Sequence, residues 1–179
     1  MAGRINTKSC LEAAAAGLKQ TGISTLIVAS TFGDTALKAA EILSDMDARL
    51  VVITHNYGFK KPAHLEMTPE TRKRLENMGA VVHTGTMPFR NIGTAIRQTL
   101  GCSQQELIAD TLRLMGQGIK VCVEIAMMAS DAGLVGTEDV IAVAGTGRGA
   151  DTAAIIRPAS SNRLFDLKIR VILAKPFDW

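Results

Sequence analysis

Short apolar runs alternate along the chain with longer stretches in which apolar residues recur at helical spacing. The runs at 25–29 and 49–54 are short and rich in β-branched residues, so each predicts a buried strand. Between them, apolar residues three and four positions apart predict a helix that ends near 44–45. This alternation of strand and helix is typical of a parallel sheet joined by crossover helices.

The same pattern extends over the rest of the chain. Ser9 and Ser103 are each followed by a glutamate three residues later, which predicts a capped helix start at both positions. Residues 120–131 begin like a strand, but the long apolar continuation and the stop at Gly133 favour a buried helix. Further strands are expected at 80–83, 140–144, 152–156 and 169–174, and further helices at 9–22, 69–78, 91–100 and 103–115.

These elements predict an α/β fold with three layers, α/β/α, around a mostly parallel central sheet with an antiparallel C-terminal strand. The second strand should lie parallel to the first and beside it. The 179 residues, 47% hydrophobic and 21% charged, are typical of one globular domain that spans 1–179.

Composition excludes several classes of function. The formal net charge is +3, basic residues are dispersed apart from 72–74, and seven residues are aromatic, so no nucleic-acid partner is expected. Three scattered cysteines predict neither disulfides nor a zinc site. Without a signal-like segment or a spanning apolar run, we expect a cytoplasmic protein with no membrane partner.

The turn after the first strand carries the first candidate chemistry. A helix that starts at the carboxyl end of a parallel strand offers free backbone N–H groups and a positive dipole end to a phosphate. Gly33 allows close backbone approach, and Ser30, Thr31 and Thr35 add hydroxyl groups. The alternative is that Thr31 or Asp34 simply caps the helix.

Two later segments are expected at the same edge of the sheet, where ligands of open α/β folds bind. His55 and Tyr57 follow the second strand and either contact a ligand or pack structurally. The glycine-rich turn at 145–149 follows the fourth strand and places Arg148 and Asp151 at the rim, unless it is a plain hairpin turn. Glu124, inside an apolar run, is either a functional carboxylate or a buried ion-pair member.

The motifs at 28–36, 118–125 and 148–159 resemble those of small stand-alone proteins with a pyruvate kinase C-terminal-domain-like fold, found largely in archaea and some bacteria. The resemblance implies FMN as cofactor, self-association into a homo-oligomer, and no pyruvate kinase activity, because no catalytic barrel precedes the motifs. With the glycine turns, it assigns these residues to cofactor binding: Ser30, Thr31, Phe32, Gly33, Asp34, Thr35, Thr54, His55, Tyr57, Gly58, Gly145, Thr146, Gly147, Arg148, Gly149 and Asp151.

Three functions are compatible with these residues. The first is an FMN-binding protein, either a flavin-dependent oxidoreductase or a flavin carrier. The second is a non-enzymatic regulatory module that binds a phosphorylated metabolite, and the third is a structural oligomer subunit. No catalytic residue and no metal ligand is assigned from the sequence.

Overall fold

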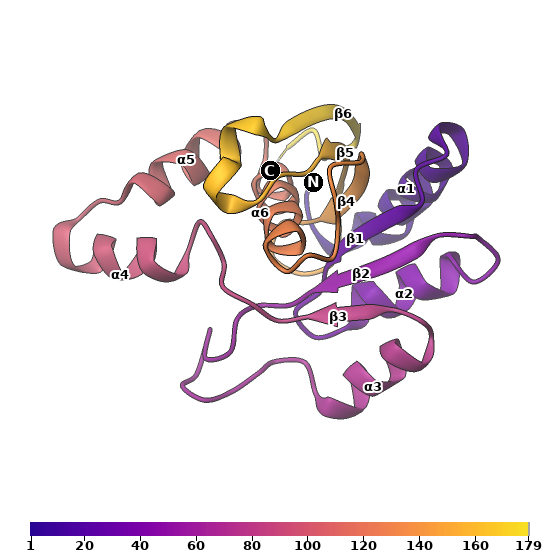
Figure 1. Ribbon diagram of the computed structural model, residues 1–179, viewed down its shortest axis with the longest axis horizontal. Helices are drawn as coiled ribbons and strands as arrows, with labels where there is room; N and C mark the ends of the chain where they lie inside the picture. Colours follow the sequence, from indigo (N-terminus) through magenta and orange to yellow (C-terminus); the bar gives the residue numbers. More distant parts are fainter. Residues whose placement is uncertain (179) are drawn as a thin grey trace.

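The computed structural model describes residues 1–178 and contains one six-stranded sheet with the strand order β3-β2-β1-β4-β5-β6 (Figure 1). The strands are β1 (Thr25–Ala29), β2 (Arg49–Ile53), β3 (Val81–His83), β4 (Val140–Ala144), β5 (Thr152–Arg157) and β6 (Lys168–Ala174). The helices are η1 (Arg4–Asn6), α1 (Thr7–Thr21), α2 (Asp34–Ile42), α3 (Pro69–Asn77), α4 (Asn91–Leu100), α5 (Gln104–Arg113), α6 (Gln117–Asp131) and η2 (Ser161–Asp166).

The predicted mostly parallel α/β sheet is confirmed. β3, β2, β1 and β4 run parallel, β5 pairs antiparallel with β4, and β6 pairs antiparallel with β5 at the sheet edge. The first two strands are neighbours, as the crossover helix between them predicts. After β1 the chain builds β2 and β3 on one side and then returns to place β4 on the other. The junction between β1 and β4 is therefore the switch point of the sheet.

Helices cover both faces of the sheet, which gives the three predicted layers. Alternate residues of a strand point to opposite faces, so Leu26 and Val28 pack with α1, α2 and α3. Ile27 packs on the other face, against the buried helix α6. The preference for a helix at 120–131 is confirmed, and α6 begins three residues earlier than predicted.

One predicted helix start is wrong. Ser9 does not cap α1, because the helix begins two residues earlier at Thr7, and the Ser9 hydroxyl donates to the Asn6 carbonyl at 3.0 Å. The Thr7 hydroxyl donates to the Arg4 carbonyl and accepts from the Ala150 backbone N–H. This contact with a distant loop stabilises the earlier start, which a local motif could not show.

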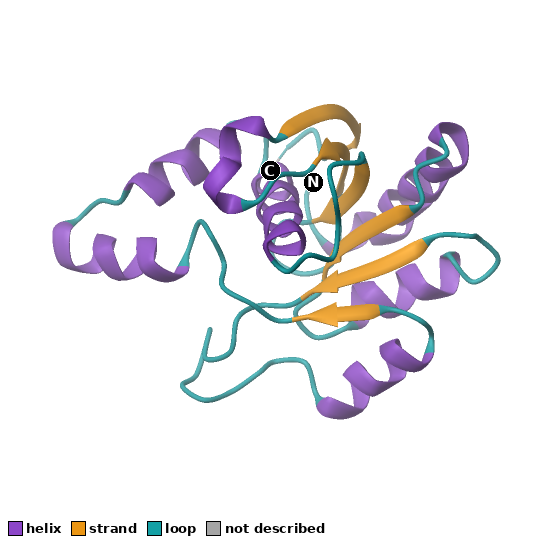
Figure 2. Cartoon of the chain, viewed as in Figure 1, coloured by secondary structure: helices purple, strands orange, loops and turns teal. Residues whose placement is uncertain are grey.

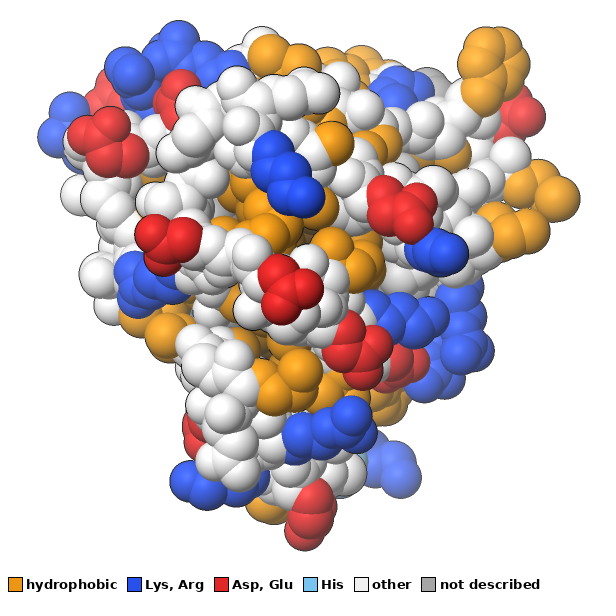
Figure 3. Space-filling view, turned by 90° about the vertical axis from the view of Figure 1, so that its right-hand side faces the viewer, with side chains coloured by type: hydrophobic (Ala, Val, Ile, Leu, Met, Phe, Trp, Pro, Cys, Tyr) orange, Lys and Arg blue, Asp and Glu red, His pale blue; other side chains and the backbone are white. Residues whose placement is uncertain are grey.

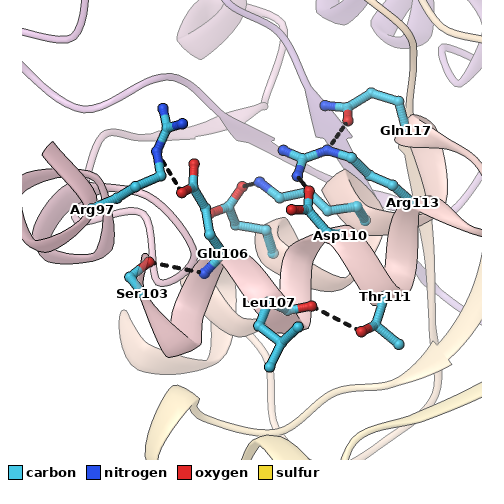
Figure 4. Close-up of polar contacts among 10 residues, drawn as sticks. Arg97, Ser103, Glu106, Leu107, Asp110, Thr111, Arg113 and Gln117 are labelled. Atoms are coloured by element: carbon cyan, nitrogen blue, oxygen red, sulfur yellow. Dashed lines mark hydrogen bonds and ion pairs between the residues drawn. The ribbon is translucent and has the colours of Figure 1, made fainter. Parts of the chain in front are cut away.

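The second predicted cap is confirmed. Ser103 Oγ accepts from the Glu106 backbone N–H at 3.2 Å at the start of α5 (Figure 4). The Glu106 carboxylate pairs with Arg97 of α4 at 2.6 Å, which joins the two helices. Both helices extend sideways from the sheet (Figure 1). Leu107 on α5 and Leu114, which directly follows this helix, are exposed.

Charged side chains of both signs are interspersed on the face turned to the viewer in Figure 3, with apolar side chains between them. No helix within residues 1–178 combines the length and apolar character that a membrane span requires.

Candidate functional site

A pocket of about 150 Å³ lies at the switch point of the sheet, where β1 and β4 end. The turn before α2, the loop after β4, the long loop after β2 and one face of α6 enclose it. Figure 2 shows that the segment between β2 and α3 is loop throughout. Of the residues assigned from the sequence, these line the pocket: Ser30, Thr31, Phe32, Asp34, Thr35, Thr54, His55, Gly145, Gly147, Arg148 and Gly149.

The start of α2 leaves backbone donors free. The N-cap residue of α2 is Gly33, and the side chains of Thr31 and Asp34 contact His55 and Arg148 instead of the helix start, so the alternative that one of them caps it is wrong. Ser30 Oγ accepts from the Ala36 N–H at 3.3 Å. Within residues 1–178, the N–H groups of Asp34 and Thr35 have no hydrogen-bond acceptor. Free N–H groups at a helix start favour a bound anion.

Gly33 has a structural reason to be glycine that differs from the one the sequence indicated. Its φ of 99° lies in the left-handed region, where other residues are strained. A Cβ added there would lie 2.3 Å from Cγ2 of Thr71 on α3. Gly33 itself does not line the pocket, so its missing side chain makes room for α3.

Arg148 joins the two loops that the sequence places at one edge. Its guanidinium lies 2.9 Å from the Asp34 carboxylate and 4.9 Å from the ring centroid of Phe32. Lys60 approaches the same ring at 5.3 Å. The mouth of the pocket therefore carries two cations, one of them paired, around a half-exposed aromatic ring.

His55 and Glu66 form a second polar group at the pocket. His55 Nε2 lies 3.4 Å from Thr31 Oγ1, and Nδ1 lies 3.8 Å from Glu66 Oε1. Among the described residues, Nδ1 and Oε1 are both buried without a hydrogen-bond partner. Burial lowers the pKa of His55, with smaller contributions from Lys60 and Arg90, while Glu66 raises it. His55 is therefore predominantly neutral at pH 7 and able to accept a proton.

Lys120 and Glu124 form a buried ion pair in the wall contributed by α6. Their side chains are 2% and 1% exposed, and both line the pocket. The second carboxylate oxygen of Glu124 accepts from the Phe89 N–H at 2.9 Å. Burial lowers the pKa of Lys120, against the opposing effect of Glu124. Glu124 is thus an ion-pair member that also lines the pocket.

Asp151 and Thr146 hold the glycine-rich loop in shape and do not line the pocket. The Asp151 carboxylate accepts from the backbone N–H groups of Gly3 and Thr146, at 2.7 and 3.0 Å, and from the Thr152 hydroxyl at 2.8 Å. All three of these hydrogen-bond donors belong to the protein chain, so the carboxylate has a structural role. Asp151 therefore anchors the N-terminal segment to the loop that carries Arg148.

Tyr57 and Gly58 also lie outside the pocket. Tyr57 is 61% exposed, and Gly58 donates its N–H to the His64 carbonyl within the long loop. No group of three or more His, Cys, Asp or Glu within residues 1–178 is arranged to hold a metal ion.

Sequence reasoning missed the loop between β3 and α4 and, apart from Glu124, the pocket-lining residues of α6. The pocket-facing residues that it did not assign include Phe59, Met87, Arg90, Gln117, Lys120 and Met128. Gln117, Lys120 and Glu124 recur every three or four residues, so a polar stripe on a buried helix was the available signal. Glu66 had no comparable signal, because it lies in an irregular loop.

Comparison with solved structures finds similarity to part of pyruvate kinase chains. No family model matches the chain. A crystal structure of a pyruvate kinase from Cryptosporidium parvum superposes over 86% of this chain with a TM-score of 0.43 and 15% sequence identity. The structure of C. parvum pyruvate kinase in complex with ADP gives the same three values. This chain covers 23% and 24% of those two chains, respectively.

Proposed function

We propose that the pocket binds a phosphorylated small molecule, with its phosphate at the start of α2. The observation that carries this proposal is the start of α2, where the free N–H groups of Asp34 and Thr35 belong to residues that line the pocket at the switch point. Arg148 adds a guanidinium beside the same turn. Guanidinium groups and helix starts both favour phosphate oxygens.

FMN is the first ligand to test, because the motifs of the chain resemble those of stand-alone pyruvate kinase C-terminal-like proteins. The residues fit its phosphate: the α2 start and Arg148 would hold it, and Ser30 and Thr35 are nearby hydroxyl groups. The flavin would supply redox chemistry, while the protein orients it. His55 is the neutral group at the pocket that could take up a proton.

A smaller phosphorylated metabolite is the second candidate, and the size of the pocket favours it. Sites that enclose drug-sized ligands measure about 300–1,000 Å³. The cavity here measures about 150 Å³. A flavin ring system would extend beyond this volume toward the loop that carries His55, whereas a three-carbon phosphate would need less room.

Absorbance of the purified protein, followed by acid release and mass determination of any ligand, tests the first candidate. Released FMN would support it. For the phosphate position, we expect riboflavin, which lacks the phosphate, to bind at least tenfold more weakly than FMN. Equal affinities would contradict a phosphate site at α2. A colourless protein that takes up no FMN but is stabilised by phosphorylated sugars would favour the second candidate.

A further inference from the structure

Lys120 is a lysine without solvent around its amine. Its side chain is 2% exposed, and its Nζ contacts the Glu124 carboxylate and lies 5.4 Å from the Phe89 ring centroid. Lysine is almost never fully buried unless it is paired. Here it stands in the wall of the pocket, one helical turn from Glu124.

The rest of the α6 wall is largely apolar. Val121, Ile125 and Met128 line the pocket beside the ion pair. In such surroundings the charged form of an amine loses hydration, which favours the neutral and nucleophilic form. Glu124 is close enough to receive the proton that the amine releases.

Stability alone does not account for this pair. Replacing a buried ion pair by apolar residues of similar volume is often neutral or stabilising, because the desolvation cost of two charges is large. A reactive role, by contrast, requires an amine and a proton acceptor side by side in the wall of a pocket, both shielded from bulk solvent. Lys120 and Glu124 meet both conditions, because they are paired, line the pocket and are 2% and 1% exposed.

We propose that Lys120 forms an imine with the carbonyl carbon of a small phosphorylated aldehyde or ketone whose phosphate lies at the start of α2. This inference rests on the phosphate-binding function proposed above and specifies the smaller-metabolite candidate. Lys120 shares the pocket with Ser30 and Thr35 of the phosphate turn. One end of the ligand would thus meet free N–H groups and the other end an amine.

The chemistry balances without a redox partner. The Lys120 ammonium transfers a proton to Glu124, and the freed lone pair forms a C–N bond with the carbonyl carbon. The carbonyl π electrons move to oxygen, which takes up one proton from Glu124 and a second from the adduct nitrogen and leaves as water while the C=N bond forms. Overall, an ammonium and a carbonyl give an iminium and one water. Glu124 receives the first proton and returns it to the departing oxygen.

Reductive trapping tests the proposal. The full-length protein is incubated with dihydroxyacetone phosphate and sodium cyanoborohydride, and the modified lysines are identified by peptide mass spectrometry. We expect the Lys120 adduct to form at least tenfold faster than an adduct at any exposed lysine. Dihydroxyacetone without phosphate should modify Lys120 at least tenfold more slowly, and inorganic phosphate should compete.

Two variants separate the reactive amine from its surroundings. Lys120→Arg should abolish the selective adduct, whereas Lys38→Arg, at an exposed position of α2, should leave it unchanged. Glu124→Gln should slow trapping at least tenfold. If Lys120→Arg fails to fold, the adduct sites in the unmodified protein still decide the question, because uniform labelling of exposed lysines would overturn the proposal.

Thermal-shift measurements distinguish a failure of the imine proposal from a failure of the phosphate-binding function on which it rests. If dihydroxyacetone phosphate raises the melting temperature and inorganic phosphate competes, but Lys120 stays unmodified, the imine is refuted and the phosphate site stands. If dihydroxyacetone phosphate, FMN and inorganic phosphate all leave the melting temperature unchanged, the phosphate site fails and the imine fails with it.

Discussion

The guanidinium of Arg148 lies 2.9 Å from the carboxylate of Asp34, across 114 residues of sequence. Both side chains are more than one-third exposed, so the pair contributes little to stability. Its importance is positional, because it places a cation over the start of α2. A bound phosphate would compete with Asp34 for this guanidinium.

Asp34 and Arg148 should have opposite effects on phosphate binding. Arg148→Ala removes a charge-assisted contact, and we expect affinity for a phosphorylated ligand to fall about tenfold, which corresponds to about 1.4 kcal/mol. Asp34→Asn removes a repulsive carboxylate and releases Arg148, so affinity should rise several-fold. Titration calorimetry at low and high salt measures both, and both effects should shrink at high salt.

Arg157 provides the matched control for Arg148. It is similarly exposed and pairs with Asp139 at 3.4 Å, and it lies outside the pocket. Arg157→Ala should leave ligand affinity unchanged. If it weakens binding as much as Arg148→Ala does, the effect is one of net charge and the position of Arg148 is irrelevant.

Gly33→Ala should destabilise the fold, whether or not a ligand binds. Left-handed backbone geometry and the 2.3 Å approach of an added Cβ to Thr71 Cγ2 both oppose it, and we expect a loss of about 2–4 kcal/mol. Thr71→Ser removes Cγ2 and keeps the hydroxyl, so it should restore part of this loss in the double variant. Denaturant unfolding measures each value.

Gly22→Ala separates backbone strain from steric overlap. Gly22 has a φ of 72°, and within the described chain an added Cβ would meet no heavy atom within 4 Å. Its substitution should cost about 1 kcal/mol, from conformation alone. A loss at Gly33 no greater than at Gly22 would contradict the contact with Thr71.

His55 should make the protein less stable as the pH falls. Because its pKa in the folded state is lowered by burial, the unfolded chain takes up a proton near pH 6.5 before the folded chain does. The free energy of unfolding should therefore decrease from about pH 7 downward until the folded-state pKa is passed. Each unit of lowering corresponds to about 1.4 kcal/mol.

Comparing His55→Gln with the unmodified protein isolates this contribution. In this variant the free energy of unfolding should decrease less between about pH 7 and pH 5 than it does in the unmodified protein. Burial and Arg72 also lower the pKa of His83, so His83→Gln should reduce the same decrease by a separate amount. Proton NMR titration of the histidine rings identifies each group, and an ordinary pKa for His55 would refute the prediction.

Breaking the Lys120–Glu124 pair from one side should be costly. Lys120→Met leaves a buried carboxylate without its cation, and we expect a loss of about 3–5 kcal/mol in the free energy of unfolding. In the double variant Lys120→Met/Glu124→Gln no charge remains, and the glutamine still accepts from the Phe89 N–H. The double variant should be more stable than Lys120→Met. If the loss in the double variant equals the sum of the losses in Lys120→Met and Glu124→Gln alone, the two residues do not interact.

Local patterns determined most of the secondary structure. The apolar runs gave buried strands, because a strand covered on both faces must be apolar throughout. Gly22 ends α1 in a left-handed conformation, and Ser103 caps α5, since both signals act over a few residues. The order of strands and helices also brought the turn at Ser30 and the loop at Arg148 to one edge.

Only the tertiary structure decided what each side chain at that edge does. Lys120 faces the pocket because of how α6 packs on the sheet, and Glu66 reaches His55 through the fold of a loop. Asp151 is turned inward by the backbone of Gly3, 148 residues away. Helix and strand patterns depend on neighbours a few residues apart. The roles of these side chains depend on contacts between segments far apart in the sequence, which no local spacing predicts.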